Sequence, residues 1–329
     1  MSPPAVQAAA LCGWTDSMPG FGVEPEQALA GAGLDIAAQT GRIPLKQFAA
    51  LAESVGERAN HPAATWMIGL NYDLAGLDQL GTAILSAKTL GTALKRFADN
   101  FELLQDTTML QFEVKGDIAT INYRILDPDI WPRHHDAMFS LGIMAQIAQM
   151  AVPGALDDIE LGLESERRET GLAVPSSRIS FGAEVNSLSL PVAMLDAAMP
   201  PCGREADLRG LSRQIAGKRR AEPARDRIAA FIYARMAQGE IHQDELASEI
   251  GMSSRTMRRR LAEAEVTFQQ LLDECRMRQA LLEFHARPGS SIAQIALRLG
   301  YAEHSNFTRA FTRWAGMPPQ RYRAAHTQH

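Results

Sequence analysis

A spaced set of small and apolar residues occurs twice in the last third of the chain and restricts what that part can fold into. In each copy an apolar residue and an alanine precede a glycine that lies four residues after the alanine. Two apolar residues four positions apart complete each set, and only the segment before them differs, by one residue. The copies are Leu246, Ala247, Ile250, Gly251, Met257 and Leu261, and Ile295, Ala296, Leu299, Gly300, Phe307 and Phe311.

This spacing has a physical cause. Two short helices that cross steeply need a small side chain where they touch, hence the two alanines. The turn between them needs a residue that adopts positive φ, hence Gly251 and Gly300. Polar residues are then expected to cap the second helix; the candidates are Ser253 or Ser254 in the first copy and Glu303 or Ser305 in the second. The pattern predicts two helix-turn-helix units, although a helical bundle with no DNA role can show similar spacing.

The second copy also gathers aromatic residues in a chain that is only 6% aromatic. We expect Tyr301, Phe307, Phe311 and Trp314 to be core residues rather than base-stacking ones. The other sides of the two second helices face outward, and their N-terminal residues are expected to contact base edges in the major groove. The predicted DNA-binding residues are Arg255, Thr256, Arg258, Arg259, His304, Ser305, Thr308, Arg309 and Arg313.

The charge of the chain is uneven. Residues 218–329 contain 18 Lys and Arg against 12 Asp and Glu, a net charge of +6, whereas residues 1–217 contain 15 against 26, a net charge of −11. Seventeen of the 18 cations are arginine, the side chain that forks onto phosphate and guanine. A basic back half behind an acidic front half favours a nucleic-acid partner for the back half.

One long helix is predicted between the two units, over Thr267–Arg287. At about 1.5 Å per residue, about 19 residues span roughly 28 Å, which is near the roughly 34 Å of one DNA turn. The two second helices are therefore expected to enter successive major grooves on one face of the DNA.

The rest of the chain has a mixed pattern. Helical periodicity covers residues 26–32, 45–55, 76–85, 90–104 and 133–150, and alternation predicts a hairpin over 109–125 and strands at 158–163, 179–181 and 187–190. Pro200–Arg225 mixes proline, glycine and alternating charge, which is typical of a connection. We predict an α+β N-terminal domain with a small antiparallel sheet over 1–205, a linker over 206–222, and an all-α domain with two helix-turn-helix units over 223–329.

The segment Ile292–Arg323 resembles the C-terminal signature of the AraC/XylS family of transcriptional regulators. It contains the alanine–glycine helix pair, the run from Gly300 to Phe311 and a closing glycine, proline and tyrosine-arginine, and a helix-turn-helix unit precedes it. The resemblance covers about residues 220–325 and implies promoter binding and activation through contact with RNA polymerase. It implies base-reading roles for Arg255, Arg258, Arg259, His304, Ser305 and Arg309, and a structural role for Pro318, Pro319 and Tyr322.

The front half resembles the arabinose-binding-type sensor domain of a subgroup of that family that includes the ornithine-utilisation regulators. The segments that carry this resemblance are Gly76–Leu104 and Arg178–Pro200. It implies a small-molecule effector of unspecified chemical class and a homodimer. Leu141–Met150 or Leu188–Met199 could supply the dimer face, although apolar segments of this kind are more often core.

One cluster in the front half, Asp127–Phe139, combines aromatic, histidine and acidic side chains. Apolar walls with a few convergent polar groups are typical of a small-molecule site. The alternative is a helix N-terminus with Asp129 or Asp136 near the dipole and with the histidines at the surface. Adjacent histidines point apart on a helix, which disfavours a metal site. The candidate effector-binding residues are Tyr72, Tyr123, Trp131, His134, His135, Asp136 and Phe139.

Other classes of function have little support in the sequence. Cys12, Cys202 and Cys275 are too scattered for a metal site or a disulfide framework, which indicates reduced thiols in a cytoplasmic protein and disfavours a DNA-repair methyltransferase. No secretory signal, membrane span, catalytic residue set or phosphate loop stands out, so we expect no enzyme, metal or cofactor. An architectural or constitutive DNA binder whose N-terminal domain only dimerises remains the alternative to an effector-responsive activator.

Overall fold

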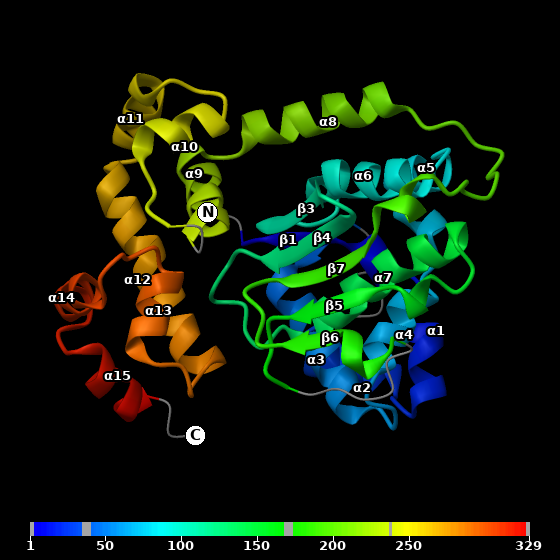
Figure 1. The fold of residues 1–329 in the computed structure, drawn as a ribbon, viewed down its shortest axis with the longest axis horizontal. Coiled ribbons are helices and arrows are strands. Elements are labelled where there is room, and N and C mark those ends of the chain that lie inside the picture. Colours follow the sequence, from blue (N-terminus) through cyan, green and yellow to red (C-terminus); the bar gives the residue numbers. More distant parts are fainter. Residues whose placement is uncertain (1–2, 35–40, 168–173, 237–238, 327–329) are drawn as a thin grey trace. The chain divides into compact units, whose positions relative to one another are not determined.

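A computed structural model of the 329-residue chain describes residues 3–34, 41–167, 174–236 and 239–326. The chain forms two compact units (Figure 1). The first comprises Met1–Ile125 and Ile130–Lys218, and the second comprises Leu126–Asp129 and Arg219–His329. The boundary after Lys218 falls inside the segment 206–222 that the sequence indicates as the connection.

The first unit contains a five-stranded sheet with the order β3-β4-β7-β5-β6. Its strands are β3 (Thr108–Lys115), β4 (Ile118–Ile125), β5 (Glu160–Leu163), β6 (Ile179–Phe181) and β7 (Asn186–Pro191). Strands β3 and β4 form the predicted hairpin, with Lys115 opposite Ile118. Strands β5 and β6 run parallel, so the prediction of a purely antiparallel sheet is wrong at this pair. Parallel pairing requires the chain to return to the same end of the sheet between the two strands.

Helix α7 (His134–Ala151) lies at the centre of this unit. It packs against β4 and β7 and also against α3 (Leu45–Arg58), α4 (Ala64–Leu70) and α6 (Leu90–Asn100). Two glycines allow α4 and α7 to approach closely, because a Cβ on Gly142 would lie 2.4 Å from the carbonyl oxygen of Trp66. Most residues of α7 are buried. Most of Leu141–Met150 and the strand residues of Leu188–Met199 therefore belong to the core rather than to a free dimer face.

The first unit contains several further helices and strands. Helices α2, α3, α5 and α6 correspond to the four helices predicted before the hairpin, whereas α4, β1 and β2 had no clear sequence signal. The elements not yet given are β1 (Ala5–Gln7), β2 (Arg42–Pro44), α1 (Trp14–Ser17), α2 (Pro25–Gly31), α5 (Asp78–Leu85) and α8 (Leu208–Ala221). Helix α8 occupies most of the predicted linker, so the connection there is helical. Its Lys218 pairs with Asp106 at 2.5 Å.

The second unit is helical throughout its described part, as predicted. Its helices are α9 (Ala224–Arg235), α10 (Gln243–Glu249), α11 (Ser254–Glu263), α12 (Phe268–Ala286), α13 (Ile292–Arg298), α14 (His304–Ala315) and α15 (Pro319–His326). Helix α12 is the predicted long helix and connects the α10–α11 pair with the α13–α14 pair (Figure 1). The short segment Leu126–Asp129 belongs to this unit, where Arg278 of α12 donates to Asp127 and Asp129 at 2.7 Å each.

Across the described ranges, no helix has the length and apolar character needed to cross a membrane.

Candidate nucleic-acid interface

The turns of the two helix pairs have the same backbone geometry. Gly251 has a φ of +70° and Gly300 a φ of +74°, the left-handed conformation predicted for both. One hydrogen bond recurs in each turn, in which the amide after the glycine donates to the carbonyl oxygen of the alanine at 3.0 Å. The repeat in the sequence is therefore a repeat in three dimensions, with α11 and α14 as the recognition helices.

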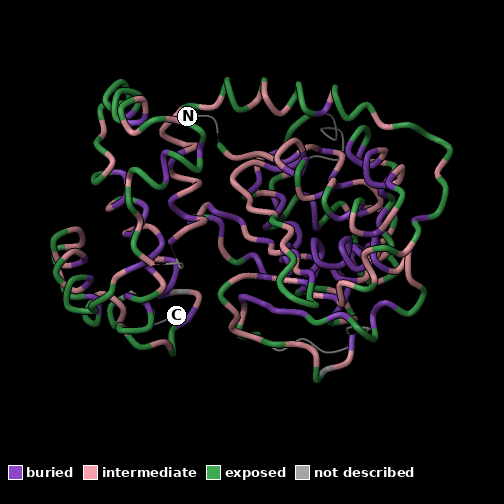
Figure 2. Tube along the Cα trace, turned by 45° about the horizontal axis from the view of Figure 1, so that its top comes forward, coloured by how far each residue is buried: buried purple, intermediate pink, exposed green. Residues whose placement is uncertain are grey.

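Two apolar residues of each recognition helix are buried and hold that helix against the rest of its helix-turn-helix unit. Met257 and Leu261 of α11 are 0% and 1% exposed, and Phe307 and Phe311 of α14 are both 0% exposed. Since each pair is four residues apart, each recognition helix buries one stripe and leaves the rest of its surface for solvent or DNA. The other residues of both helices are exposed or half-buried (Figure 2).

The aromatic residues of the second unit form a core, as predicted. The ring of Phe311 lies 5.3 Å from that of Phe284 in α12, 5.4 Å from that of Tyr322 in α15 and 6.5 Å from that of Trp314, measured between centroids. Edge contacts of this kind add about 0.5–1.5 kcal/mol each to the free energy of burial. Tyr322 thus closes the domain structurally, in keeping with the role expected for it.

The caps of the two recognition helices differ. Ser253 caps α11, because its Oγ accepts a hydrogen bond from the amide of Thr256 at 3.2 Å. Glu303 is the N-cap of α14, but its side chain makes no capping hydrogen bond. Of the four candidates from the sequence, the structure therefore selects Ser253 and Glu303, and only the first acts through its side chain.

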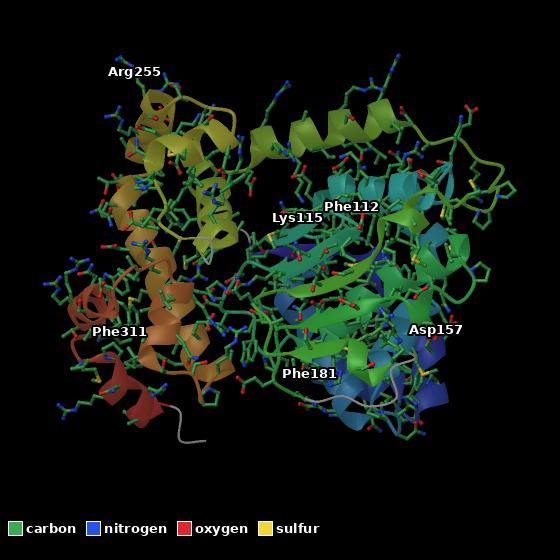
Figure 3. All side chains as sticks on the ribbon, viewed as in Figure 1. Phe112, Lys115, Asp157, Phe181, Arg255 and Phe311 are labelled. Atoms are coloured by element: carbon green, nitrogen blue, oxygen red, sulfur yellow. The ribbon has the colours of Figure 1, made fainter. Side chains whose placement is uncertain are left out.

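The predicted DNA-binding residues of α11 lie on its outer surface. Arg255, Arg258 and Arg259 are exposed and Thr256 is half-buried, and Figure 3 shows Arg255 on the outer side of α11. Arg259 lies 3.8 Å from Glu263, a distance at which the pair contributes little in water. Arg258 Nε donates to the carbonyl oxygen of Ser254 at 3.4 Å, so Arg258 and Arg259 have weak local contacts that a phosphate or a guanine edge can replace.

The corresponding residues of α14 are more constrained. His304, Ser305, Arg309 and Arg313 are exposed, but Arg313 Nη2 donates to Asp273 of α12 at 2.6 Å. Arg309 Nη2 donates to the side-chain oxygen of Asn306 at 2.6 Å. The half-buried Thr308 donates its hydroxyl to the carbonyl oxygen of His304 at 3.0 Å. Exposed Asn306 is absent from the predicted set although its amide has the donor and acceptor that adenine recognition uses.

In the first unit, candidate effector-binding residues surround the N-terminal turn of α7. Tyr123 of β4 donates its hydroxyl to Asp136 Oδ2 at 2.7 Å and accepts from Gln105 Nε2 at 3.0 Å. The amide of His135 donates to Glu53 Oε1 of α3 at 2.7 Å. His134 and His135 are 7% and 0% exposed, so the expectation that the histidines lie at the surface is wrong. The helix N-terminus expected with it is present, because α7 begins at His134 and has Asp136 in its first turn.

Two carboxyl groups of this network are unusually costly to ionise. Burial raises the pKa of Glu53 to about 7 and the pKa of Asp136 to about 6. Asp136 Oδ1 is buried and has no hydrogen-bond partner among the described residues. A buried carboxylate with an unused oxygen favours any ligand group that can donate a hydrogen bond or a positive charge to it.

The other three candidate effector-binding residues lie in adjoining clusters. The ring of Phe139 is 5.5 Å from that of Tyr72, whose hydroxyl donates to the carbonyl oxygen of Ala9 at 2.6 Å. Half-buried Trp131 lies under the guanidinium of Arg133 at 5.8 Å. The structure therefore joins Tyr123 to Asp136 by one hydrogen bond and His135 to Glu53 by another, whereas Tyr72, Phe139 and Trp131 make separate ring and cation contacts.

Several polar residues of this region carried no sequence signal. Arg133 forms a buried double contact with Glu164, with distances of 3.0–3.2 Å. Glu53, Gln105 and Glu164 come from distant segments, and no local spacing marks them. In the described part of the chain no group of three or more His, Cys, Asp or Glu residues is placed to hold a metal ion.

Comparisons with known proteins agree with these two units. The family described as the arabinose-binding domain of AraC transcription regulators matches residues 22–199, and a helix-turn-helix domain family matches residues 246–325. An uncharacterized HTH-type transcriptional regulator of Mycobacterium tuberculosis is 32% identical over 268 residues, which cover 78% of this chain and 76% of that protein.

Two further similarities extend over most of the chain. The ornithine utilization regulator of Pseudomonas aeruginosa is 26% identical over 303 residues, which cover 87% of this chain and 85% of that protein. The crystal structure of the transcriptional regulator CdpR from Pseudomonas aeruginosa is 22% identical and covers 91% of this chain and 96% of that one, with a TM-score of 0.37.

Proposed function

The chain belongs to the AraC family of transcription regulators, and on that premise we propose that it activates transcription in response to a small molecule. It is a DNA-binding regulator, not an enzyme, and its N-terminal domain is of the ligand-binding type. The activating step is a contact with RNA polymerase at the promoter. The chain acts in the cytoplasm, where its promoter DNA is.

One observation carries the DNA-binding part of this proposal: two like-built helix pairs in one unit each turn a cationic recognition helix outward. We assign DNA contact to the residues predicted from the sequence, with Arg255, Arg258 and Arg259 in α11 and His304, Ser305 and Arg309 in α14 as base-reading candidates. Thr256 and Thr308 are half-buried and Arg313 is paired with Asp273 of α12, and we assign these three phosphate contacts or support of their neighbours.

Footprinting on the promoter beside its own gene tests this assignment. The full chain should protect two adjacent major-groove segments, with affinity that falls steeply as salt rises. Arg309→Ala should remove protection of one segment, and Lys95→Ala, which removes an exposed cation from the first unit, should leave both. Unchanged protection by Arg309→Ala would contradict the assigned face of α14.

We further propose that the effector carries a positively charged group. The support is the pair of buried carboxyl groups, Glu53 and Asp136, whose ionised forms a cation would stabilise. An amine is also compatible with the name of one relative, an ornithine utilization regulator. Thermal-shift screening should find an amine that raises the melting temperature through binding linkage, and Asp136→Asn should lose that response. A response to neutral sugars alone would refute the cationic class, and no response to any metabolite would favour the constitutive DNA binder.

We assign the homodimer contact to the free edge of β3. This eight-residue strand ends the sheet, and no other described strand pairs with its outer edge. Val114 is 50% exposed there, and the half-buried Leu110 and Phe112 pack against the core of the unit. Figure 3 labels Phe112 on this strand. Antiparallel pairing of two copies about Phe112 would set Val114 of one copy opposite Leu110 of the other and leave no like charges opposed.

Oxidative cross-linking tests this dimer. Phe112→Cys should form a disulfide-linked dimer, because a residue on the two-fold axis lies within disulfide reach of its copy. Ile118→Cys, which is also exposed but outside this register, is the matched control, and the wild-type chain reports any background from native cysteines. A dimer in solution that Phe112→Cys fails to cross-link would place the interface elsewhere.

A further inference from the structure

The internal repeat extends to the helix that precedes each helix pair. Arg227 of α9 and Arg276 of α12 are 49 residues apart, which is the interval that separates Gly251 from Gly300. Neither arginine belongs to the spaced set of small and apolar residues that defines the repeat. Their equivalent positions raise the question of what each does in its own unit.

Both arginines donate hydrogen bonds to the turn of the helix pair that follows them in the chain. Arg227 Nη2 donates to the carbonyl oxygen of Ile250 at 2.5 Å. Arg276 Nε donates to the carbonyl oxygen of Leu299 at 3.0 Å and its Nη2 to that of Gly300 at 3.3 Å. Ile250 and Leu299 are the equivalent C-cap residues of the first helices of the two pairs.

These carbonyl groups need partners. The last carbonyls of a helix have no partner within it, and a cation at this end also interacts favourably with the helix dipole. In each unit the same residues lead through the glycine into the recognition helix. A guanidinium that holds these carbonyls therefore fixes the point from which the recognition helix departs.

Two further observations separate these arginines from the DNA-facing ones. Arg276 is only 9% exposed, and its guanidinium lies 4.4 Å above the ring of Tyr301, the residue after the turn glycine. Arg227 is half-buried. Within the described residues neither is paired with a carboxylate, so the backbone of the turn is their main polar partner. Lysine could not reproduce the forked donor geometry of Arg276.

We infer that Arg227 and Arg276 are equivalent positioning residues, each of which sets the orientation of one recognition helix independently of the other. Arg227 orients α11 and Arg276 orients α14. Neither touches DNA, and each affects only the half of the binding site that its own unit reads. The DNA consequence rests on the proposed function, whereas the effect on the helices does not.

Hydrogen exchange on the free full-length chain tests the inference without DNA. Arg276→Met should speed amide exchange in α14 by about tenfold, the effect of losing about 1.4 kcal/mol of local stability, and leave α11 unchanged. Arg227→Met should do the reverse. Arg276→Lys should restore protection only in part, and it carries the test if the methionine variant does not fold. Equal acceleration in both recognition helices, or in neither, would overturn the inference.

Footprinting supplies the second readout. Each methionine variant should lose protection of one major-groove segment and keep the other, with affinity about tenfold weaker. Base changes in the DNA segment that is no longer protected should then no longer affect binding. A general loss of protein stability would not produce this result. Arg321→Met, which removes an exposed cation from α15, is the matched control for charge. If the wild-type chain protects no promoter, the proposed function fails, and the exchange measurement still decides the inference.

Discussion

Arg133 and Glu164 of the first unit form an ion pair whose side chains are 3% and 4% exposed, whereas Arg313 and Asp273 of the second unit form one whose side chains are 66% and 22% exposed. The same chemical groups thus lie inside one unit and on the surface of the other. The second unit also buries a pair, Glu283 and Arg287, but neither of these residues lies on a recognition helix.

The difference separates two ways of using charge. In the core of the first unit, ionisable groups are desolvated, so their protonation and pairing are linked to folding and to whatever binds there. On α11 and α14 the charges are solvated and cost little to present, so they are available to an anionic polymer and sensitive to salt. This contrast is compatible with the proposed division between an effector-binding unit and a DNA-binding surface.

The largest expected effect contrasts the two ion pairs. Glu164→Ala should lower the free energy of unfolding by about 3–5 kcal/mol, because it leaves the Arg133 guanidinium buried without its carboxylate. Asp273→Ala should cost less than about 1 kcal/mol, because Arg313 then only returns to water. Urea unfolding followed by tryptophan fluorescence measures both, since Trp14, Trp66 and Trp131 lie in the first unit and Trp314 lies in the second. Similar losses for the two variants would remove the distinction between the units.

The next effect concerns pH. Glu53 has its pKa raised from 4.5 to about 7, so its contribution to stability is complete below about pH 4.5 and is lost as pH rises through about 7. Glu53→Gln keeps an acceptor for the His135 amide but cannot ionise. Between pH 5 and 8 the variant should therefore lose about 2 kcal/mol less unfolding free energy than the wild type.

Equilibrium unfolding at a series of pH values checks this expectation. Glu26→Gln, a change of the same charge at an exposed position of α2, is the control and should follow the wild type. A wild-type profile parallel to that of Glu53→Gln across this range would mean that burial of Glu53 does not govern the response.

The surface cations should act on DNA and not on stability. Arg258→Ala and Arg309→Ala should each weaken promoter binding by about 1–3 kcal/mol if they read bases, or reduce the salt slope by about 1 if they contact phosphate. Their unfolding free energies should stay within about 0.5 kcal/mol of the wild type. Binding titrations at several salt concentrations distinguish the two roles. A variant that lost several kcal/mol of stability would show that the surface of its helix is part of the core after all.

The same contrast explains how much the sequence predicts. The helix-turn-helix units are encoded locally, so the spacing of alanine, glycine and apolar residues predicts both turns, both buried stripes and the connecting helix. Ser253 as a cap and the aromatic core follow from the same local pattern. The outward position of Asn306 follows from the same helical spacing, although spacing alone does not say which outward side chain contacts a base.

In the first unit most local elements are predictable, with α4, β1 and β2 as exceptions, but the network of polar contacts is not. The amide of His135 meets Glu53 across 82 residues, and Arg133 meets Glu164 across 31. No spacing rule reports such pairs, because they depend on how helices and strands pack together. The parallel pairing of β5 with β6 and the helix within the predicted linker were missed for a related reason, since tertiary contacts override weak local signals.

The smallest expected effect tests whether the recognition helices are stabilised locally. Ser253→Ala should cost about 1 kcal/mol, because the amide at the start of α11 loses the side-chain acceptor it has in the folded chain. Glu303→Ala should change stability by a few tenths of a kcal/mol, since its side chain makes no such bond in α14, and Glu303→Ser should gain about 0.5 kcal/mol by supplying one. Hydrogen exchange in the first turn of each helix measures the three variants separately. Equal effects of the two alanine variants would mean that packing, not capping, sets the start of both recognition helices. The two helix-turn-helix units would then differ less than their caps indicate.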